Sequence, residues 1–195
     1  MEATLVYRLW QSPFAERKLR PFLQEIEAVG VRRVLDVGCG PGTNARHFTG
    51  CDYLGVDVNP SYVADATRRF GPRFRAVDVT TLDPATLGSG YDCILMNSLL
   101  HHLDDESTAR LLAHVETLLS PEGRVHILDL VLPDRPSIAR ALARLDRGDY
   151  PRPLEAWRRL FTSHFSAIRF DPYPLGFPGL TLWNMVYFAG GRRAP

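Results

Sequence analysis

Residues 34–44 read VLDVGCGPGTN, and this stretch decides the fold. An apolar run typical of a buried strand contains the acidic Asp36 and passes into a turn with Gly38, Gly40 and Gly42 on alternate positions. Glycine lets the backbone adopt positive φ, and its missing Cβ lets main-chain N–H groups come close to a ligand. A strand followed by such a turn is typical of a site that cradles a small-molecule cofactor.

A second acidic residue follows about twenty residues later, at a spacing known from nucleotide-binding folds. The run YLGVDV, residues 53–58, places Asp57 near the end of another strand. A carboxylate there accepts hydrogen bonds from two ribose hydroxyls, so the two acidic residues indicate a ligand that contains a nucleoside. The spacing differs from the G-x-G-x-x-G pattern of dinucleotide sites, because the third glycine position counted from Gly38 is Thr43.

The pattern D-x-G-x-G-x-G that begins at Asp36 resembles motif I of the class I S-adenosylmethionine (SAM) dependent methyltransferases. The resemblance continues in order through residues 30–132, including the run YDCILMNSLLHHLD at 91–104. It implies an α/β fold, a Rossmann-like three-layer sandwich with a seven-stranded, mostly parallel sheet and an antiparallel C-terminal strand. It also implies SAM as the cofactor and S-adenosyl-L-homocysteine as the product.

The resemblance assigns the cofactor contacts to residues at or near strand ends. Asp57 is implied to bind the ribose, and Asp78, which ends the strand-like run 73–78, is implied to contact the adenine amino group. The cofactor-binding residues expected on this basis are Asp36, Gly38, Gly40, Gly42, Asp57, Val58, Asp78, Val79 and Asn97. Carboxyl ends of parallel strands meet at one edge of a sheet, so we expect these residues to converge. Taken singly, an Asp at a strand end is also a common turn former or helix N-cap.

Strand-like and helix-like segments alternate along the chain. Strands are predicted at 32–37, 52–57, 73–78, 92–97 and 124–131, and helices at 42–49, 60–69 and 105–119. This alternation implies right-handed crossovers and a parallel sheet. The extended runs 166–172 and 182–189 predict a final antiparallel pair. Apolar residues at near-helical intervals over 4–29 predict N-terminal helices, which we expect Pro13 and Pro21 to divide.

We expect one domain over residues 1–195. Its parts are an N-terminal helical cover at 1–29, a SAM-binding core at 31–132, and acceptor-side helices with the terminal strand pair at 133–195. The cover of the site must then come from the N-terminal helices and from segments 132–160 and 173–181. Tyr150, Phe177 and Trp183 either line an apolar acceptor pocket or pack in the core.

Composition is that of a single enzyme domain. A net charge of +1 gives no global attraction to nucleic acid or to an anionic membrane. We find neither an apolar run of 18 residues nor a signal peptide. Cys39, Cys51 and Cys93 lack metal-ligand spacing, so we expect no metal and a location in the reducing cytoplasm. The expected partner is a small-molecule acceptor, and the chain is expected to be a monomer or homodimer.

His101 and His102, directly after the fourth predicted strand, are the catalytic candidates. The sulfonium of SAM is already activated, so transfer requires a nucleophile placed in line with the methyl group. A base is needed only where the acceptor must lose a proton, and histidine is suited to deprotonate a phenol, a hydroxyl or an activated carbon. The alternative is that the pair caps the next helix or packs beneath the cofactor. We expect only one of two adjacent side chains to point into the site.

The residues after the fourth predicted strand also narrow the range of possible methyl acceptors. Residues 97–100 read NSLL. In the resembling family, methyltransferases that act on nucleobase amines or glutamine amides typically carry Asn/Asp-Pro-Pro-Tyr/Phe at this place. We therefore expect methylation of a small molecule, with O- or C-methylation favoured. Two alternatives stay open, a methyltransferase-like protein that binds SAM without turnover and, less favoured, an NAD(P)-dependent oxidoreductase.

Overall fold

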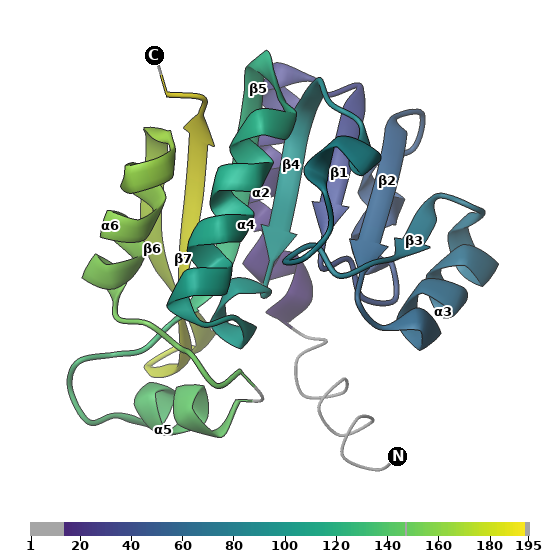
Figure 1. The fold of residues 1–195 in the computed structure, drawn as a ribbon. Helices are drawn as coiled ribbons and strands as arrows, with labels where there is room; N and C mark the ends of the chain where they lie inside the picture. Colours follow the sequence, from purple (N-terminus) through teal and green to yellow (C-terminus); the bar gives the residue numbers. More distant parts are fainter. Residues whose placement is uncertain (1–13, 147, 194–195) are drawn as a thin grey trace.

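The strands of the computed structural model form one sheet, and the structure describes residues 14–146 and 148–193. The strands are β1 (Arg33–Val37), β2 (Asp52–Asp57), β3 (Phe74–Ala76), β4 (Tyr91–Asn97), β5 (Leu119–Val131), β6 (Ser166–Phe177) and β7 (Leu180–Gly191). Their order is β3-β2-β1-β4-β5-β7-β6 (Figure 1). The first five strands are parallel, and the antiparallel pairs are β5 with β7 and β7 with β6. The predicted Rossmann-like, mostly parallel, seven-stranded sheet is confirmed.

Helices cover both faces of the sheet. The α-helices are α2 (Ala15–Val29), α3 (Pro60–Phe70), α4 (Asp105–Leu118), α5 (Ile138–Leu145) and α6 (Leu154–His164), and the 3-10 turns are η2 (Thr43–His47), η3 (Pro84–Leu87) and η4 (Leu100–His102). Figure 1 shows α4 and α6 in front of the sheet, α2 behind it, and α5 on the side where the parallel strands end. None of the helices in the described ranges is long and apolar enough to cross a membrane.

The core follows the alternation of side chains along each strand. Successive residues of a strand point to opposite faces, so Val34 packs on the α2 side while Leu35 packs on the α4 side. Trp157 and Phe161 of α6 are 0% exposed. Burial of each such side chain contributes about 1.5–3 kcal/mol to the free energy of folding. The sheet is thus held rigidly between two apolar layers.

Two helix predictions in the N-terminal half were wrong. The predicted helix at 42–49 is the short 3-10 turn η2, bounded by Gly42 at φ 75° and Gly50 at φ 86°. Two left-handed residues so close together leave no room for an α-helix to form and extend. Pro21 lies inside α2 and does not divide it, because the helix is fixed by buried Leu19 and Phe22. Pro13 lies outside the described residues.

The strand pair at the C-terminus is longer than predicted. The Pro- and Gly-rich segment 173–181, expected to be a loop over the site, belongs largely to β6 and β7, which stay paired as far as Phe177 and Leu180. Gly179, at φ 78°, makes the tight turn between them. In contrast, β3 ends early at Ala76, so Asp78 lies beyond the strand that was predicted to end with it.

Candidate cofactor and acceptor site

The glycine turn after β1 is strained in a way that only glycine tolerates. Gly38, Gly40 and Gly42 have φ of 72°, 53° and 75°, all in the left-handed region. A Cβ on Gly38 would lie 2.9 Å from Leu99 Cδ1, and one on Gly42 would lie 2.8 Å from the Cβ of Ala66. A Cβ on Gly40 would meet nothing within 4 Å. Gly40 therefore faces space that the protein leaves open.

Asp57 ends β2 directly beside this turn. Its Oδ2 accepts a hydrogen bond from the Gly40 N–H at 2.8 Å, and its Oδ1 accepts one from the Asn59 N–H at 2.8 Å. Gly38 N–H in turn donates to the Val56 carbonyl at 2.8 Å, which ties the turn to the end of β2. The half-buried carboxylate is thus held in one orientation next to open space, as a ribose ligand would require.

Asp36 lies deeper, on β1, and is fully buried. Its Oδ2 accepts hydrogen bonds from the Tyr53 hydroxyl at 2.7 Å and from Asn44 Nδ2 at 3.1 Å, while its Oδ1 has no partner. Burial raises the pKa of Asp36 to about 6, although the two hydrogen bonds oppose the rise. Burial thus disfavours the charged form of Asp36, and a cationic hydrogen-bond donor at Oδ1 would stabilise that form.

Asn97 adds a second unpartnered oxygen near the first. Its Nδ2 donates to Asn44 Oδ1 at 3.5 Å, and Asn44 also bonds Asp36, so one side chain bridges the ends of β1 and β4. Asn97 Oδ1 is buried and has no hydrogen-bond partner in the structure. Buried polar atoms are almost always paired in native proteins, so two such acceptors beside one turn call for a ligand that donates hydrogen bonds.

The predicted adenine residues lie at the open end of the same edge. Val77 N–H donates to the Asp57 carbonyl at 2.9 Å, which brings the segment after β3 to the end of β2. Asp78 is exposed and accepts hydrogen bonds from the Thr80 N–H and hydroxyl at 2.9 and 2.6 Å. Val58 is 68% exposed, and Val79 is half-buried. An exposed apolar side chain next to the proposed ribose site suits the face of an aromatic base.

His101 is enclosed by two carboxylates on the acceptor side of the site. Its Nδ1 lies 2.6 Å from Asp129 Oδ1 on β5, and its Nε2 lies 3.2 Å from Asp146 Oδ1, just after α5. Burial alone would lower the pKa of His101, but Asp129 and then Asp146 raise it to about 9. Asp129 is itself buried, and the charge and hydrogen bond of His101 hold its pKa below the usual range. His101 therefore carries a proton at neutral pH.

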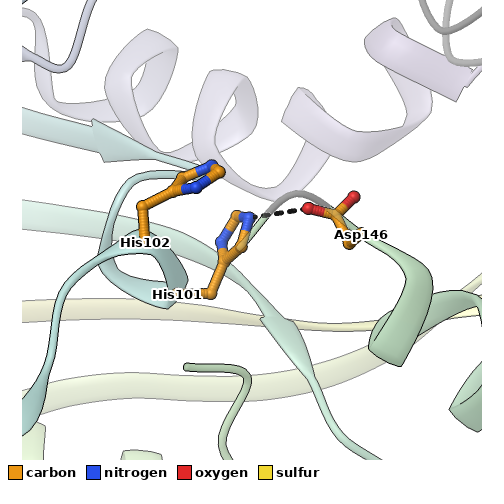
Figure 2. A group of neighbouring side chains, drawn as sticks. All are labelled: His101, His102 and Asp146. Carbon is orange, nitrogen blue, oxygen red and sulfur yellow. Dashed lines mark hydrogen bonds and ion pairs between the residues drawn. The ribbon is translucent and has the colours of Figure 1, made fainter. Parts of the chain in front are cut away.

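His102 lies beside it with a different exposure. The two rings have centroids 4.2 Å apart with 38° between their planes, and His101 is buried while His102 is exposed. Figure 2 shows the His101 ring between the His102 ring and the Asp146 carboxylate. The short 3-10 turn brings the two rings together, and that only one of them points into the site stays a prediction. Of the two, His102 is the ring that a ligand can reach.

A lysine on α2 closes the site from the other face. Lys18 Nζ donates to the hydroxyl of Ser98, the one described non-glycine residue with positive φ, at 56°. Burial lowers the pKa of Lys18 to about 8, and the charges of Asp129 and Asp146 offset part of that shift. The Tyr173 hydroxyl donates to the Lys18 carbonyl at 2.7 Å, so the C-terminal strand pair fixes the start of α2.

Hydrogen bonds hold the loop between α5 and α6 against η4. Tyr150 N–H donates to the His101 carbonyl at 2.9 Å, and Arg152 donates to the carbonyls of Leu100 and Leu103 at 3.1 and 2.8 Å. Gly148 packs flat on the His101 ring, since a Cβ there would lie 2.1 Å from His101 Cδ2. This loop therefore covers η4 and one face of the His101 ring.

Comparison with known proteins identifies the family of this chain. A family model described as a methyltransferase domain matches residues 7–170. This chain belongs to that methyltransferase family. This match confirms the predicted membership of the class I SAM-dependent methyltransferases, and the structural neighbours show the same fold.

Relatives of this methyltransferase domain include proteins named for the group or the molecule that they methylate. A trans-aconitate 2-methyltransferase of Methylobacterium nodulans is 31% identical over 118 residues, which are 56% of this chain and 44% of that protein. The O-methyltransferase resE of Aspergillus sclerotiorum is 28% identical over 151 residues, 69% of this chain and 51% of that protein. The chain thus spans about half the length of the curated relatives it matches.

Solved structures show the same fold. The N-methyltransferase NodS from Bradyrhizobium japonicum, in complex with S-adenosyl-L-homocysteine, has a TM-score of 0.72 at 15% identity and covers 92% of this chain and 87% of its own. The YcgJ protein of Bacillus subtilis has a TM-score of 0.68 at 18% identity, covering 91% of this chain and 99% of its own. At these identities the likeness concerns the fold alone.

Several residues of the methyltransferase site were missing from the sequence-based prediction. Asp129 and Asp146 flank His101, Lys18 bonds the Ser98 hydroxyl, and Asn44 and Tyr53 fix Asp36. Two of them had a signal in the sequence. Asp129 is the one charged residue within the apolar run 127–131, and Lys18 is the sole lysine of the chain. For Asp146 the sequence offers no signal, because only the folded loop brings it to His101.

The predicted pocket aromatics separate into two groups. Trp183 is buried in the methyltransferase domain, where its ring centroid lies 5.6 Å from that of Phe14. Phe177 also packs on Phe14, at 5.4 Å, but it is 58% exposed. Tyr150 is 44% exposed on the loop that is bonded to His101. Trp183 is therefore a core residue, and Tyr150 is the one of the three whose backbone is bonded to His101.

Proposed function

We propose that this methyltransferase domain transfers a methyl group from SAM to an oxygen or carbon atom of a small-molecule acceptor. The names of the two relatives, a trans-aconitate 2-methyltransferase and an O-methyltransferase, support the class of acceptor. The observation that carries the proposal is the pair of buried, unpartnered oxygens, Asp36 Oδ1 and Asn97 Oδ1, beside a glycine turn with open space over Gly40. An amino acid ammonium group supplies the hydrogen-bond donors that these acceptors lack.

The other predicted cofactor residues fit the rest of a SAM molecule. In our proposal the carboxylate of Asp57 accepts the two ribose hydroxyls, because its oxygens are already aligned by Gly40 and Asn59. Val58 and Val79 then contact the adenine ring, and Asp78 accepts a hydrogen bond from its amino group. Gly38 and Gly42 keep the turn close to β4 and α3, so that Gly40 lies at the cofactor.

The histidine pair acts on the acceptor. When bound, SAM supplies a methyl group on a positively charged sulfur, which is a good leaving group. His101 cannot take up a proton near neutral pH, because both of its ring nitrogens already donate to carboxylates. We therefore propose that the exposed His102 ring contacts the reacting atom of the acceptor and favours its deprotonated form, while His101 positions that ring.

Calorimetry of SAM binding tests the cofactor assignment. Asp57→Ala removes hydrogen bonds to a charged group worth about 1.5–3 kcal/mol each, so we expect SAM affinity to fall roughly 10- to 150-fold per bond lost. Asp52→Ala is the matched control, since Asp52 is an exposed carboxylate at the opposite end of the same strand. Equal SAM affinity of wild type and Asp57→Ala would overturn the ribose assignment.

Formation of S-adenosyl-L-homocysteine tests turnover. We expect product with a panel of carboxylic acids, phenols and enols, and loss of product in His102→Ala. SAM binding without product from any acceptor would favour a binding protein without turnover. A thermal shift with NAD or NADP in place of SAM would instead favour an oxidoreductase, because a ligand of the native state raises its stability.

We also propose a setting for this activity. Cys39, Cys51 and Cys93 are unpaired in the structure, which suits a reducing cytoplasm. We propose a monomer or homodimer that acts on a small molecule and not on nucleic acid or a membrane surface. Size-exclusion chromatography with light scattering distinguishes the monomer from the homodimer.

A further inference from the structure

His101, His102 and Asp146 form a compact group on the acceptor side, here called the His–His–Asp cluster. One potential ligand atom from each residue lies within 4.8 Å of the other two. Figure 2 shows the two imidazole rings side by side, with the Asp146 carboxylate facing His101. Two imidazoles and one carboxylate are a ligand set that zinc, cobalt, nickel and iron(II) all accept.

The distances within the cluster suit a shared cation. A hydrogen bond between a charged nitrogen and a carboxylate is usually about 2.7–2.9 Å long. His101 Nε2 and Asp146 Oδ1 are 3.2 Å apart, whereas His101 Nδ1 and Asp129 Oδ1 are only 2.6 Å apart. Two ligand atoms that each lie about 2.1 Å from one tetrahedral metal are roughly 3.4 Å apart. The Asp146 contact is therefore closer to a pair of metal ligands than the Asp129 contact is.

Asp129 supplies the support that a ligating histidine needs. Metal-binding histidines usually donate their other ring N–H to a carboxylate, which fixes the tautomer and the orientation of the ring. Asp129 lies at Nδ1 of His101 and is itself held by the N–H groups of Leu100 and Leu130 at 2.8 and 2.7 Å. This leaves Nε2, which faces Asp146, as the atom at which a bound cation would replace the proton.

The cluster is closed on one side and open on the other. Gly148 covers the buried ring of His101, with no room for a side chain between them. His102 is exposed, so a cation held by the three residues would keep positions accessible from outside. Three protein ligands with an open position are typical of catalytic metal sites.

Charge decides what would fill the open position. Asp129 and Asp146 contribute two negative charges, and the Lys18 ammonium is close enough to both for their charges to act on its pKa. A divalent cation with neutral histidines would leave the group with one net positive charge. An acceptor oxygen that binds as an anion would neutralise that charge.

We propose that the His–His–Asp cluster binds a divalent transition-metal cation, which in turn binds the acceptor oxygen. This inference rests on the proposed function for the acceptor and specifies an oxygen nucleophile, and it has His102 favour the deprotonated acceptor through the cation in place of direct contact. A cation there lowers the pKa of the acceptor hydroxyl, whose proton passes to solvent. The new O–CH₃ bond then forms as the S–CH₃ bond breaks, with its electron pair going to sulfur. The sequence-based expectation of no metal considered only cysteine spacing.

Cobalt(II) titration of the chelator-treated full chain tests this inference without any turnover. We expect one equivalent to bind, with a visible absorption band from the coordinated ion. His102→Ala and Asp146→Asn should each weaken binding by roughly tenfold or more, and Asp129→Asn by about 10- to 100-fold. Lys18→Met should strengthen it, because a nearby positive charge is removed. Asp149→Ala, an exposed carboxylate three residues from Asp146, is the matched control and should bind like wild type.

The outcomes separate this inference from the proposed function. Circular dichroism confirms that each variant is folded, and His102 is exposed, so His102→Ala should fold normally. No bound cobalt or zinc in the wild type, or equal affinity in His102→Ala and Asp146→Asn, would overturn the metal site. Calorimetry with SAM on the same samples tests the cofactor site, so SAM binding without metal binding would contradict this inference alone.

Discussion

At the scale of single residues, backbone conformation and burial explain why the turn after β1, residues 38–42, needs its glycines and the carboxylates beside it. Gly40 is the position where conformation and ligand approach can be tested separately. Its left-handed φ of 53° disfavours any side chain, yet the protein itself leaves the space above it empty. Gly50 has a left-handed φ of 86° and equally open surroundings, but it follows η2, away from the Asp57 carboxylate.

Gly40→Ala should therefore abolish SAM binding, while Gly50→Ala should leave it unchanged. Both variants place a Cβ at positive φ, so each should lose about 1 kcal/mol of unfolding free energy. Urea unfolding measures the stability, and calorimetry measures the affinity for SAM. Normal SAM binding by Gly40→Ala would mean that the turn is only a tight connection.

Asp36 predicts how SAM affinity depends on pH. Burial raises the pKa of Asp36 to about 6, so the carboxylate is charged above that pH and neutral below it. The ammonium group of SAM favours the charged form, so affinity should be full at pH 7.5 and should fall as the pH drops through about 6. Asp36→Asn should bind weakly at both pH values and should show a flatter profile. A wild-type affinity that is constant between pH 7.5 and 5 would contradict the proposed contact.

Candidate residues that lie in a recognisable local pattern could be named from the sequence, whereas those that meet only through the fold could not. Asp36 and Asp57 were expected at the cofactor because each ends its own apolar run beside a recognisable turn. Asp129 and Asp146 lie 28 and 45 residues after His101, and no local pattern links them to it. Lys18 reaches Ser98 from 80 residues away. The proposed cofactor residues could therefore be named from the sequence, and the groups around His101 needed the structure.

At the scale of elements, the loop from α5 to α6 is fixed by one buried arginine. Arg152 bonds the carbonyls of Leu100 and Leu103 and the Asp105 carboxylate, and its guanidinium stacks on Trp157 at 4.8 Å. The strands were predictable because apolar runs mark them. The helix at 42–49 was not, because two left-handed glycines restrict it to a 3-10 turn.

Arg152→Met should loosen the loop between α5 and α6, and this should lower both the stability of the protein and its affinity for the acceptor. Loss of two hydrogen bonds to buried carbonyls at about 1–3 kcal/mol each should lower the unfolding free energy by roughly 2–4 kcal/mol. The KM for the acceptor should rise more than the KM for SAM, because the loop borders the acceptor side alone. Arg110→Met, in an exposed pair with Glu106, is the control and should stay within about 0.5 kcal/mol of wild type. Equal stability of the two variants would contradict the account.

At the scale of the whole molecule, a buried histidine under α2 couples the fold to pH. His126 on β5 accepts or donates a hydrogen bond with the Tyr187 hydroxyl at 2.9 Å, and its ring packs on Phe22. Burial lowers the pKa of His126 to about 3, so the native state holds it neutral while the unfolded chain takes up a proton below about pH 6.5. Its contribution to stability is present above pH 6.5 and is lost as the pH falls.

His126→Gln should remove this part of the pH dependence. One proton taken up on unfolding changes stability by about 1.4 kcal/mol per pH unit, so the wild type should lose about 2 kcal/mol between pH 6.5 and 5 through this residue. Glutamine keeps a hydrogen-bonding side chain without titrating there, so the variant's acid-side slope should be smaller by that amount. Urea midpoints at the two pH values measure the difference, and identical slopes would contradict the assignment.

We propose that SAM binds at the carboxyl ends of β1 and β2 and that the acceptor binds at those of β4 and β5. A crystal structure with S-adenosyl-L-homocysteine tests it most directly. We predict the ribose hydroxyls on the Asp57 carboxylate, the ammonium group at Asp36 Oδ1 and Asn97 Oδ1, and the sulfur directed toward His102. A ribose bound away from Asp57, or a sulfur directed away from the histidine pair, would contradict the account.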